Sequence, residues 1–175
     1  MIIVGLGNPG KEFEGTRHNV GFMVLDVLIK HFPEASWKEE FGVAWAKVGS
    51  HLLIKPQEFM NVSGATLHTF QQKKHISFLA RTRQSELLVV HDDLDFQPGE
   101  VREQYDRSAA GHNGVQSIID RYGAEFHRLR IGIGNNKQHN IPAEDYVLQK
   151  FSSDEQAIMN TAIQQAVELL QKKLE

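Results

Sequence analysis

Short apolar runs along the chain alternate with longer segments of helical periodicity, and the two patterns predict strands and helices in turn. The strongest strand pattern is Glu86–His91 (ELLVVH), in which apolar and β-branched residues follow one another without interruption. Met1–Val4 is a second short run of the same kind, so we predict that both segments are buried strands. The other predicted strands are 43–47, 51–55, 101–105 and 128–134.

Apolar residues at helical spacing predict four helices. The first is Val20–Phe32, with Thr16 as its predicted N-cap and Pro33 as its end. The other three are 60–74, 115–122 and 154–174. On the last of them, the apolar positions that we predict to share one face are Ile158, Ala162, Ala166, Leu169 and Leu170.

The segments between these elements are short and predict one domain. Polar stretches at 77–85 and 135–141 are predicted loops, and 37–41 is a predicted connection. The 175 residues suffice for a sizeable core, and they contain no internal repeat or linker. We therefore predict a single α/β domain over residues 1–175: a twisted mixed sheet, largely parallel in its core, with helices on both faces.

Composition excludes several classes of protein. The formal net charge is −3 and the sequence pI is about 6.3, which argues against a general nucleic-acid coat but permits a local basic strip. With no cysteine, disulfides and thiolate metal sites are excluded. No apolar stretch approaches the roughly 18 residues of a membrane span, and no signal-peptide pattern precedes the first strand. We expect a cytoplasmic protein.

The stretch Gly5-Leu6-Gly7-Asn8-Pro9-Gly10 matches the dinucleotide-binding fingerprint G-x-G-x-x-G. In that motif the third glycine lies inside a helix, and an acidic residue follows the next strand about 20 positions on. Here Pro9 precedes the last glycine, the helical period starts only near Val20, and Asp26 lies inside the predicted helix. We therefore reject a dinucleotide site and interpret the glycines as a tight turn beside a different site.

His18 is the strongest candidate for chemistry. It follows the glycine-rich strand exit, stands between the polar residues Arg17 and Asn19, and lies in the first turn of a predicted helix. A lone histidine is more often structural or simply exposed. The positive end of a helix dipole, however, disfavours imidazolium, and a general base must be neutral near pH 7. A carboxylate on its other ring nitrogen would fix the tautomer.

Three carboxylates follow the ELLVVH strand, at Asp92, Asp93 and Asp95. They permit three interpretations: a solvated acidic turn, an oxygen-rich Mg²⁺ or Mn²⁺ site, or a partner that orients His18. From the residue types alone, the first two are about equal and both are favoured over the third.

Three asparagines lie in glycine-flanked or cap-like settings, at Asn8, Asn61 and Asn113. Each taken alone is best explained as a turn or cap residue, because asparagine bonds its own backbone and tolerates left-handed conformations. Taken together, they are suited to line a cleft for a peptide-like ligand, whose backbone offers the same amide groups.

Five blocks of sequence occur in the order typical of a known family. They are GLGNPG with TRHNVGF, KPQEFMNVSG, VVHDDLDFQPG, GHNGVQSII, and FHRLRIGIG with a late YVLQKF. On these blocks the chain resembles bacterial-type peptidyl-tRNA hydrolase over essentially its whole length. The resemblance implies hydrolysis of the ester that joins a peptide to the 3′ ribose of tRNA, which recycles tRNA from abandoned translation.

The resemblance also assigns residues. It implies that His18 is the base that activates water, that Asp92 rather than Asp93 is its partner, and that no metal or cofactor takes part. The positions implied to contact substrate or water are Asn8, Phe13, Met60, Asn61 and Asn113. This favours the third interpretation of the acidic cluster.

The chain departs from the family pattern after Pro98-Gly99. The family usually has two spaced basic residues there, which meet the 5′ phosphate of tRNA, and then a glycine-rich run. Here Arg102 keeps the first basic position, Gln104 occupies the second, and 105–110 replaces the glycines. Arg107 is our candidate for a replacement charge.

The implied partner is peptidyl-tRNA, engaged through the tRNA acceptor end and the nascent peptide, with no membrane partner. We expect a monomer. The altered segment keeps a second hypothesis open: a paralogue that binds tRNA or a ribosomal partner and hydrolyses little.

Overall fold

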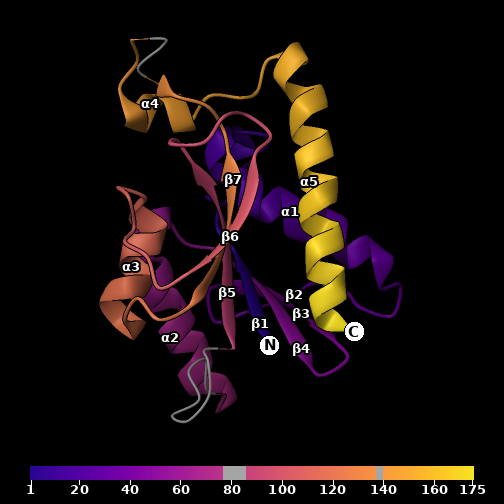
Figure 1. Ribbon diagram of the computed structural model, residues 1–175. Helices are drawn as coiled ribbons and strands as arrows, with labels where there is room; N and C mark the ends of the chain where they lie inside the picture. Colours follow the sequence, from indigo (N-terminus) through magenta and orange to yellow (C-terminus); the bar gives the residue numbers. More distant parts are fainter. Residues whose placement is uncertain (77–85, 137–139) are drawn as a thin grey trace.

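The apolar runs form one seven-stranded mixed sheet in the computed structural model, which describes residues 1–76, 86–136 and 140–175. The strand order is β2-β3-β4-β1-β5-β7-β6, and β4, β1, β5 and β7 are parallel to one another (Figure 1). β2, β3 and β6 run antiparallel to their neighbours. The bounds are β1 (Ile2–Gly5), β2 (Lys38–Glu40), β3 (Val43–Val48), β4 (His51–Pro56), β5 (Leu87–Asp93), β6 (Val101–Tyr105) and β7 (His127–Gly132).

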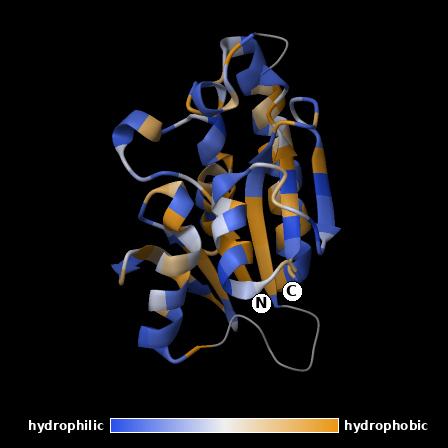
Figure 2. Ribbon diagram, turned by 90° about the vertical axis from the view of Figure 1, so that its left-hand side faces the viewer, coloured by the Kyte–Doolittle hydropathy of each residue, from blue (hydrophilic) through white to orange (hydrophobic). Residues whose placement is uncertain are grey.

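The two strands with the most apolar sequences lie in the middle of the sheet. Every residue of β1 and β5 is buried, and the two strands pair in parallel with Val4 opposite Val89. A parallel strand covered on both faces has no solvent side, so its sequence reads as a continuous apolar run rather than an alternating one. Figure 2 shows this centre as hydrophobic strands.

Helices cover both faces of the sheet, as the sequence predicts (Figure 1). On one face, α1 (Val20–Leu28) and α5 (Ser153–Leu174) share a core with β1, β5 and β7. On the other, α2 (Ser63–Lys74) and α3 (Asn113–Tyr122) share a second core with β1, β4 and β5. A short helix, α4 (Ala143–Val147), precedes α5.

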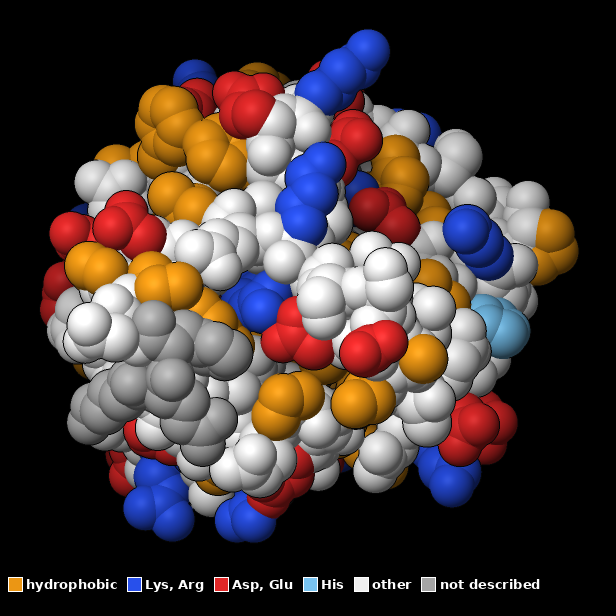
Figure 3. Space-filling view, turned by 90° about the horizontal axis from the view of Figure 1, so that it is seen from above, with side chains coloured by type: hydrophobic (Ala, Val, Ile, Leu, Met, Phe, Trp, Pro, Cys, Tyr) orange, Lys and Arg blue, Asp and Glu red, His pale blue; other side chains and the backbone are white. Residues whose placement is uncertain are grey.

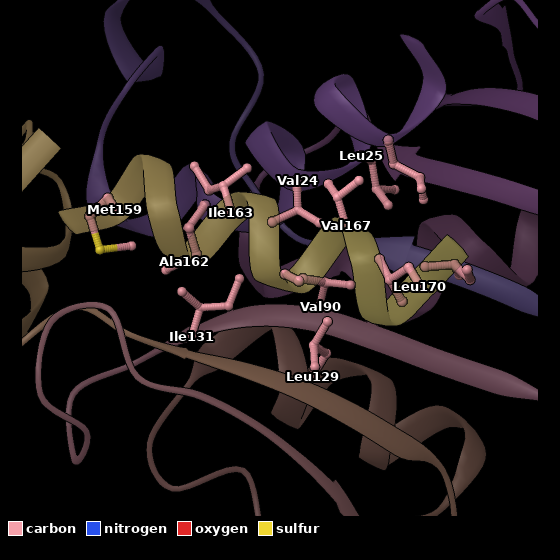
Figure 4. Close-up of a cluster of buried hydrophobic side chains, with 14 of the residues drawn as sticks. Val24, Leu25, Val90, Leu129, Ile131, Met159, Ala162, Ile163, Val167 and Leu170 are labelled. Carbon is pink, nitrogen blue, oxygen red and sulfur yellow. The ribbon is translucent and has the colours of Figure 1, made fainter. Parts of the chain in front are cut away.

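The long helix α5 docks on its own sheet, and the predicted face is confirmed at Ala162, Ala166 and Leu170, with Leu169 partly buried against the same core. Its buried residues are Met159, Ala162, Ile163, Ala166, Val167 and Leu170, which meet α1 and the sheet (Figure 4). The prediction for Ile158 is wrong, because this side chain is 47% exposed. A capping box at Ser152 and Glu155 fixes where the helix begins.

The first glycines serve close packing more than turning. A Cβ on Gly5 would lie 2.4 Å from the carbonyl oxygen of Gly21, and one on Gly21 would lie 2.4 Å from the carbonyl oxygen of Val90. These contacts let α1 sit directly against β1 and β5. Of Gly5, Gly7 and Gly10, only Gly10 has a positive φ, of 113°. The predicted tight turn is therefore wrong for Gly5 and correct for Gly10.

Several predicted boundaries differ from the observed ones. The predicted connection 37–41 contains β2, whose three residues are all polar and exposed. Thr16 is not a side-chain cap, since its hydroxyl donates to the carbonyl of Phe13 at 2.8 Å and α1 starts after a 3₁₀ turn. The predicted loop 77–85, and positions 137–139 of the loop 135–141, lie outside the described residues.

None of the helices in the described ranges combines the length and the apolarity that crossing a membrane requires.

Candidate active site

A cavity of about 330 Å³ opens where β5 ends and α3 begins. Its lining includes His18, Asp92, Asp93, Asp95, His112, Asn113 and Glu144, together with apolar residues of the 109–111 segment and α4. Figure 3 views the molecule from the end at which α4 lies. Because β1 and β5 are parallel, their carboxyl ends bring residues that are far apart in sequence to one place.

The segment that carries His18 is anchored on both sides. The guanidinium of Arg17 is buried, donates to both carboxylate oxygens of Glu155 at 2.7 and 2.8 Å, and lies over the ring of Tyr146. The side chain of Asn19 exchanges two 2.9 Å hydrogen bonds with the backbone of Asn8. The 3₁₀ turn Arg17–Asn19 is thus tied to both α5 and the glycine-rich turn.

His18 and Asp92 form a hydrogen-bonded pair. The Nδ1 atom of His18 lies 2.9 Å from Oδ1 of Asp92, and both side chains are at most 10% exposed. A carboxylate accepts, so Nδ1 carries the proton and Nε2 is the unprotonated nitrogen of the neutral ring. The geometry therefore fits the interpretation in which one aspartate orients His18.

Opposing effects set the ionisation of this pair. Burial by itself lowers the pKa of His18. The charge of Asp92 and the hydrogen bond that His18 donates to it raise the pKa, and the net result is a pKa above the usual 6.5. Burial also raises the pKa of Asp92, but the histidines beside it outweigh burial and hold its pKa well below the usual range. Asp92 is therefore ionised at neutral pH and stabilises the protonated form of His18.

A second histidine, which the sequence analysis did not select, meets the same carboxylate. Nε2 of His112 lies 2.9 Å from Oδ1 of Asp92, and the His112 and His18 rings are 4.7 Å apart. His112 is also the N-cap of α3, where its Nδ1 accepts from the backbone of Gly114 and Val115. The sequence feature that could have pointed to His112 is its position directly before Asn113-Gly114, at the start of a predicted helix.

The donor atoms of His18, Asp92 and His112 lie within 4.8 Å of one another, a spacing that a metal ion can use. The hydrogen bonds argue against that use. Nδ1 of His112 accepts two backbone N–H groups, so its proton is on Nε2, and a metal on Nε2 would require an imidazolate. Asp93 is also engaged, with Arg130 at 2.6 Å and with the backbone of Asp95 at 2.9 Å.

Asn8 and Met60 lie together, but neither is among the residues that line this cavity. The Oδ1 atom of Asn8 accepts from the backbone N–H of Met60 at 2.9 Å. That bond fixes the orientation of the amide, so its Nδ2 donors point away from Met60. Met60 itself is buried, and its sulfur packs where a side chain on Gly114 would otherwise stand.

Of the other predicted substrate residues, Asn61 and Asn113 line a hollow and Phe13 does not. Asn113 begins α3 and lines both the main cavity and a second depression, of about 380 Å³, that Asn61 also lines. Phe13 meets Phe59 edge to face at 6.4 Å, and Phe59 is 62% exposed. Phe59 was not predicted; an aromatic residue directly before Met60-Asn61 was its only signal.

The predicted phosphate residues do not line either hollow. Arg102 pairs with Glu100 and lies 4.6 Å above the ring of Phe96. Arg107 is exposed on the segment after β6. Gln104, which stands at the second basic position, accepts a hydrogen bond from Arg130 at 2.5 Å.

The family model described as peptidyl-tRNA hydrolase matches residues 2–175. The chain belongs to the peptidyl-tRNA hydrolase family. It is 41% identical to the peptidyl-tRNA hydrolases of Bacillus pumilus and of Aquifex aeolicus, over 99% of this chain and 92% and 90% of theirs. It superposes on the crystal structure of the Acinetobacter baumannii peptidyl-tRNA hydrolase with a TM-score of 0.82 and 34% identity, covering 95% of this chain and 84% of that one.

Membership of the peptidyl-tRNA hydrolase family confirms the resemblance and the predicted α/β fold. The individual residue assignments rest on the geometry of this chain. Of the predicted residues, His18, Asp92 and Asn113 share one cavity, Asn8 and Met60 share a hydrogen bond, and Arg102 and Arg107 lie apart from them.

Proposed function

We propose that this protein hydrolyses the ester bond between peptide and tRNA in peptidyl-tRNA, with His18 as general base. The observation that carries the proposal is the pair formed by His18 and the buried, ionised Asp92, at the wall of an open cavity in a chain of this family. An ester is easier to cleave than an amide, so one activated water with modest support for the oxyanion suffices.

In this mechanism, His18 both removes a proton from water and returns it to the leaving oxygen. Its Nε2 takes a proton from a water molecule as that water attacks the ester carbonyl, while Asp92 holds Nδ1–H and stabilises the imidazolium. The tetrahedral intermediate then expels the 3′ oxygen of the ribose. His18 returns the proton to that oxygen, which leaves a free peptide acid, a free tRNA end and the neutral base.

Amide donors support the developing negative charge. Because Oδ1 of Asn8 is held by Met60, its Nδ2 is the group left for water or the oxyanion. We assign the same task to Asn113, which lines the cavity beside His112. We assign the substrate end next to the ester to Met60 and Asn61, and a further substrate contact to Phe13.

For the nucleic acid, we propose that Arg102, aided by Arg107, meets phosphate. Figure 3 shows acidic and basic side chains interspersed on this end of the molecule, without one continuous basic field. Few phosphate contacts imply a shallow dependence of the cleavage rate on salt.

The Arg102 assignment predicts a change in that salt dependence. Arg102→Gln should lower the slope of log(kcat/KM) against log[salt] by about one, because one phosphate contact releases about one counterion. Lys30→Gln, on the exposed 3₁₀ turn after α1, is the matched control and should leave the slope unchanged. An Arg102→Gln slope equal to that of wild type would refute the phosphate contact.

We further propose a monomer that acts in the cytoplasm, where peptidyl-tRNA arises. Sedimentation of the protein with and without tRNA tests the first part: a single species near 19.8 kDa is expected for the free protein.

Incubation with a peptidyl-tRNA and with the corresponding free tRNA tests the function itself. We expect loss of the ester, with peptide acid and intact tRNA as the only products. Selective binding of peptidyl-tRNA without loss of the ester would instead support the second hypothesis, a binding paralogue.

A further inference from the structure

Asp92 is shared by two histidines, and only one of them is used by the mechanism above. His18 and His112 both place a ring nitrogen 2.9 Å from the same atom, Oδ1 of Asp92. A single carboxylate oxygen therefore divides its negative charge between two N–H donors. The share of negative charge that stabilises the N–H group of His112 is not available to stabilise the protonated form of His18.

The backbone fixes the tautomer of His112. Gly114 and Val115 can only donate through their backbone N–H groups, which point at Nδ1 of His112 at 3.2 and 3.3 Å. Nδ1 is thus an acceptor, and Nε2 carries the proton that goes to Asp92. The start of α3 thereby determines which atom of His112 faces the carboxylate.

Neighbouring rings hold His112 in this orientation. Its ring lies 4.7 Å from that of His18 and 4.9 Å, edge to face, from that of His91. His91 is fully buried, its Nδ1 bonds the backbone carbonyl of Asp92 at 2.7 Å, and burial lowers its pKa to about 3, so it stays neutral. The His112 side chain is only 7% exposed, so water does not readily replace its hydrogen bond.

Other charged or titratable groups also face this cluster. Asp93 and Asp95 at the end of β5 and Glu144 of α4 line the cavity. Arg130 of β7 pairs with Asp93, and Arg17 beside His18 pairs with Glu155. None of these groups bonds Oδ1 of Asp92, so His112 is the described residue that competes with His18 for that atom.

We propose that His112 is a positioning residue of the reaction: its Nε2–H holds Oδ1 of Asp92 in place and limits how much of the negative charge reaches His18. The base then stays partly unprotonated near neutral pH instead of being locked as an imidazolium. This inference rests on the proposed function for its catalytic consequence, but its electrostatic part is a property of the free protein.

Two substitutions separate the hydrogen bond that His112 donates to Asp92 from its role as the N-cap of α3. Asparagine places its Oδ1 where the Nδ1 of histidine stands, so His112→Asn keeps the cap of α3 and removes the donor to Asp92. Glutamine places its Nε2 where the Nε2 of histidine stands, so His112→Gln keeps the donor and loses the cap. A merely structural residue would give the larger defect in His112→Gln.

The first readout is the titration of the His18 ring by NMR in the free protein, which does not depend on turnover. In His112→Asn we expect the His18 midpoint to rise by roughly half to one pH unit, because a hydrogen bond to a charged group that is worth about 1.5 kcal/mol corresponds to about one unit. In His112→Gln the midpoint should stay close to wild type, while Tm falls by roughly 2–4 °C.

The second readout is the pH dependence of peptidyl-tRNA cleavage. In His112→Asn, the acid limb of the profile of kcat/KM against pH should move to higher pH by the same amount as the NMR midpoint. KM should change little. An unchanged His18 midpoint in His112→Asn would overturn the proposal. If that variant does not fold, the wild-type protein still decides, because a His112 ring protonated on Nδ1 would contradict it. A wild-type protein that cleaves nothing would refute the proposed function and leave the NMR test intact.

Discussion

His18→Asn should reduce kcat/KM for peptidyl-tRNA by about 10³-fold or more while leaving the fold intact. A positioned general base contributes roughly 10²–10⁴-fold, and the neighbouring His112 cannot replace it, because its Nε2–H donates to Asp92 and its Nδ1 accepts from the start of α3. Asparagine retains a polar group near the Nδ1 position, so Asp92 keeps a partner and is not left as an unpaired buried charge.

Single-turnover cleavage with enzyme in excess measures this effect, with circular dichroism and Tm recorded on the same sample. His31→Asn is the matched control, since this histidine is exposed on the 3₁₀ turn after α1, and it should retain full activity. Cleavage by folded His18→Asn at a rate within tenfold of wild type would remove His18 from the mechanism.

Asp92→Asn should have the second largest effect, a fall in kcat of about 10²–10⁴-fold with little change in KM. The substitution preserves shape and an acceptor for both histidines but removes the charge that stabilises the imidazolium. Burial then lowers the pKa of His18 without the opposing charge of Asp92, so the base becomes weaker.

Asp93→Asn is the comparison that tests the choice between adjacent aspartates. Asp93 is bonded to Arg130 and to the backbone of Asp95 rather than to a histidine. We expect less than a tenfold loss of kcat in this variant. The reverse order of effects, with Asp93→Asn the slower enzyme, would show that Asp92 was the wrong choice.

The sequence was most informative where one physical requirement dominated. A strand covered on both faces must be apolar throughout, so the ELLVVH run predicted that β5 is a buried strand. The three-residue edge strand β2 is polar and exposed, and no apolar pattern marks it. In α5 the predicted face was correct at Ala162, Ala166 and Leu170 and wrong at Ile158, where the adjacent Met159 is the buried residue.

In the candidate site, too, some features could be predicted from the sequence and others depended on tertiary structure. His18 could be selected from its local setting, but its pairing with Asp92 joins positions 74 residues apart, and only the parallel packing of β1 and β5 brings them together. Residue types alone ranked that pairing below a metal site. His112 was overlooked because a histidine at a helix start has an adequate explanation as a cap, and its second bond, to Asp92, depends on tertiary structure.

The pH dependence of single-turnover cleavage, in wild type and in Asp92→Asn, tests the central claim most directly. The base works only when unprotonated, so activity is lost as the pH falls through the pKa of His18, which in wild type lies above 6.5. In Asp92→Asn, burial alone lowers the pKa of His18, and the acid limb should move to lower pH while the plateau falls. Acid limbs that coincide in the two proteins would contradict a mechanism in which Asp92 sets the basicity of His18.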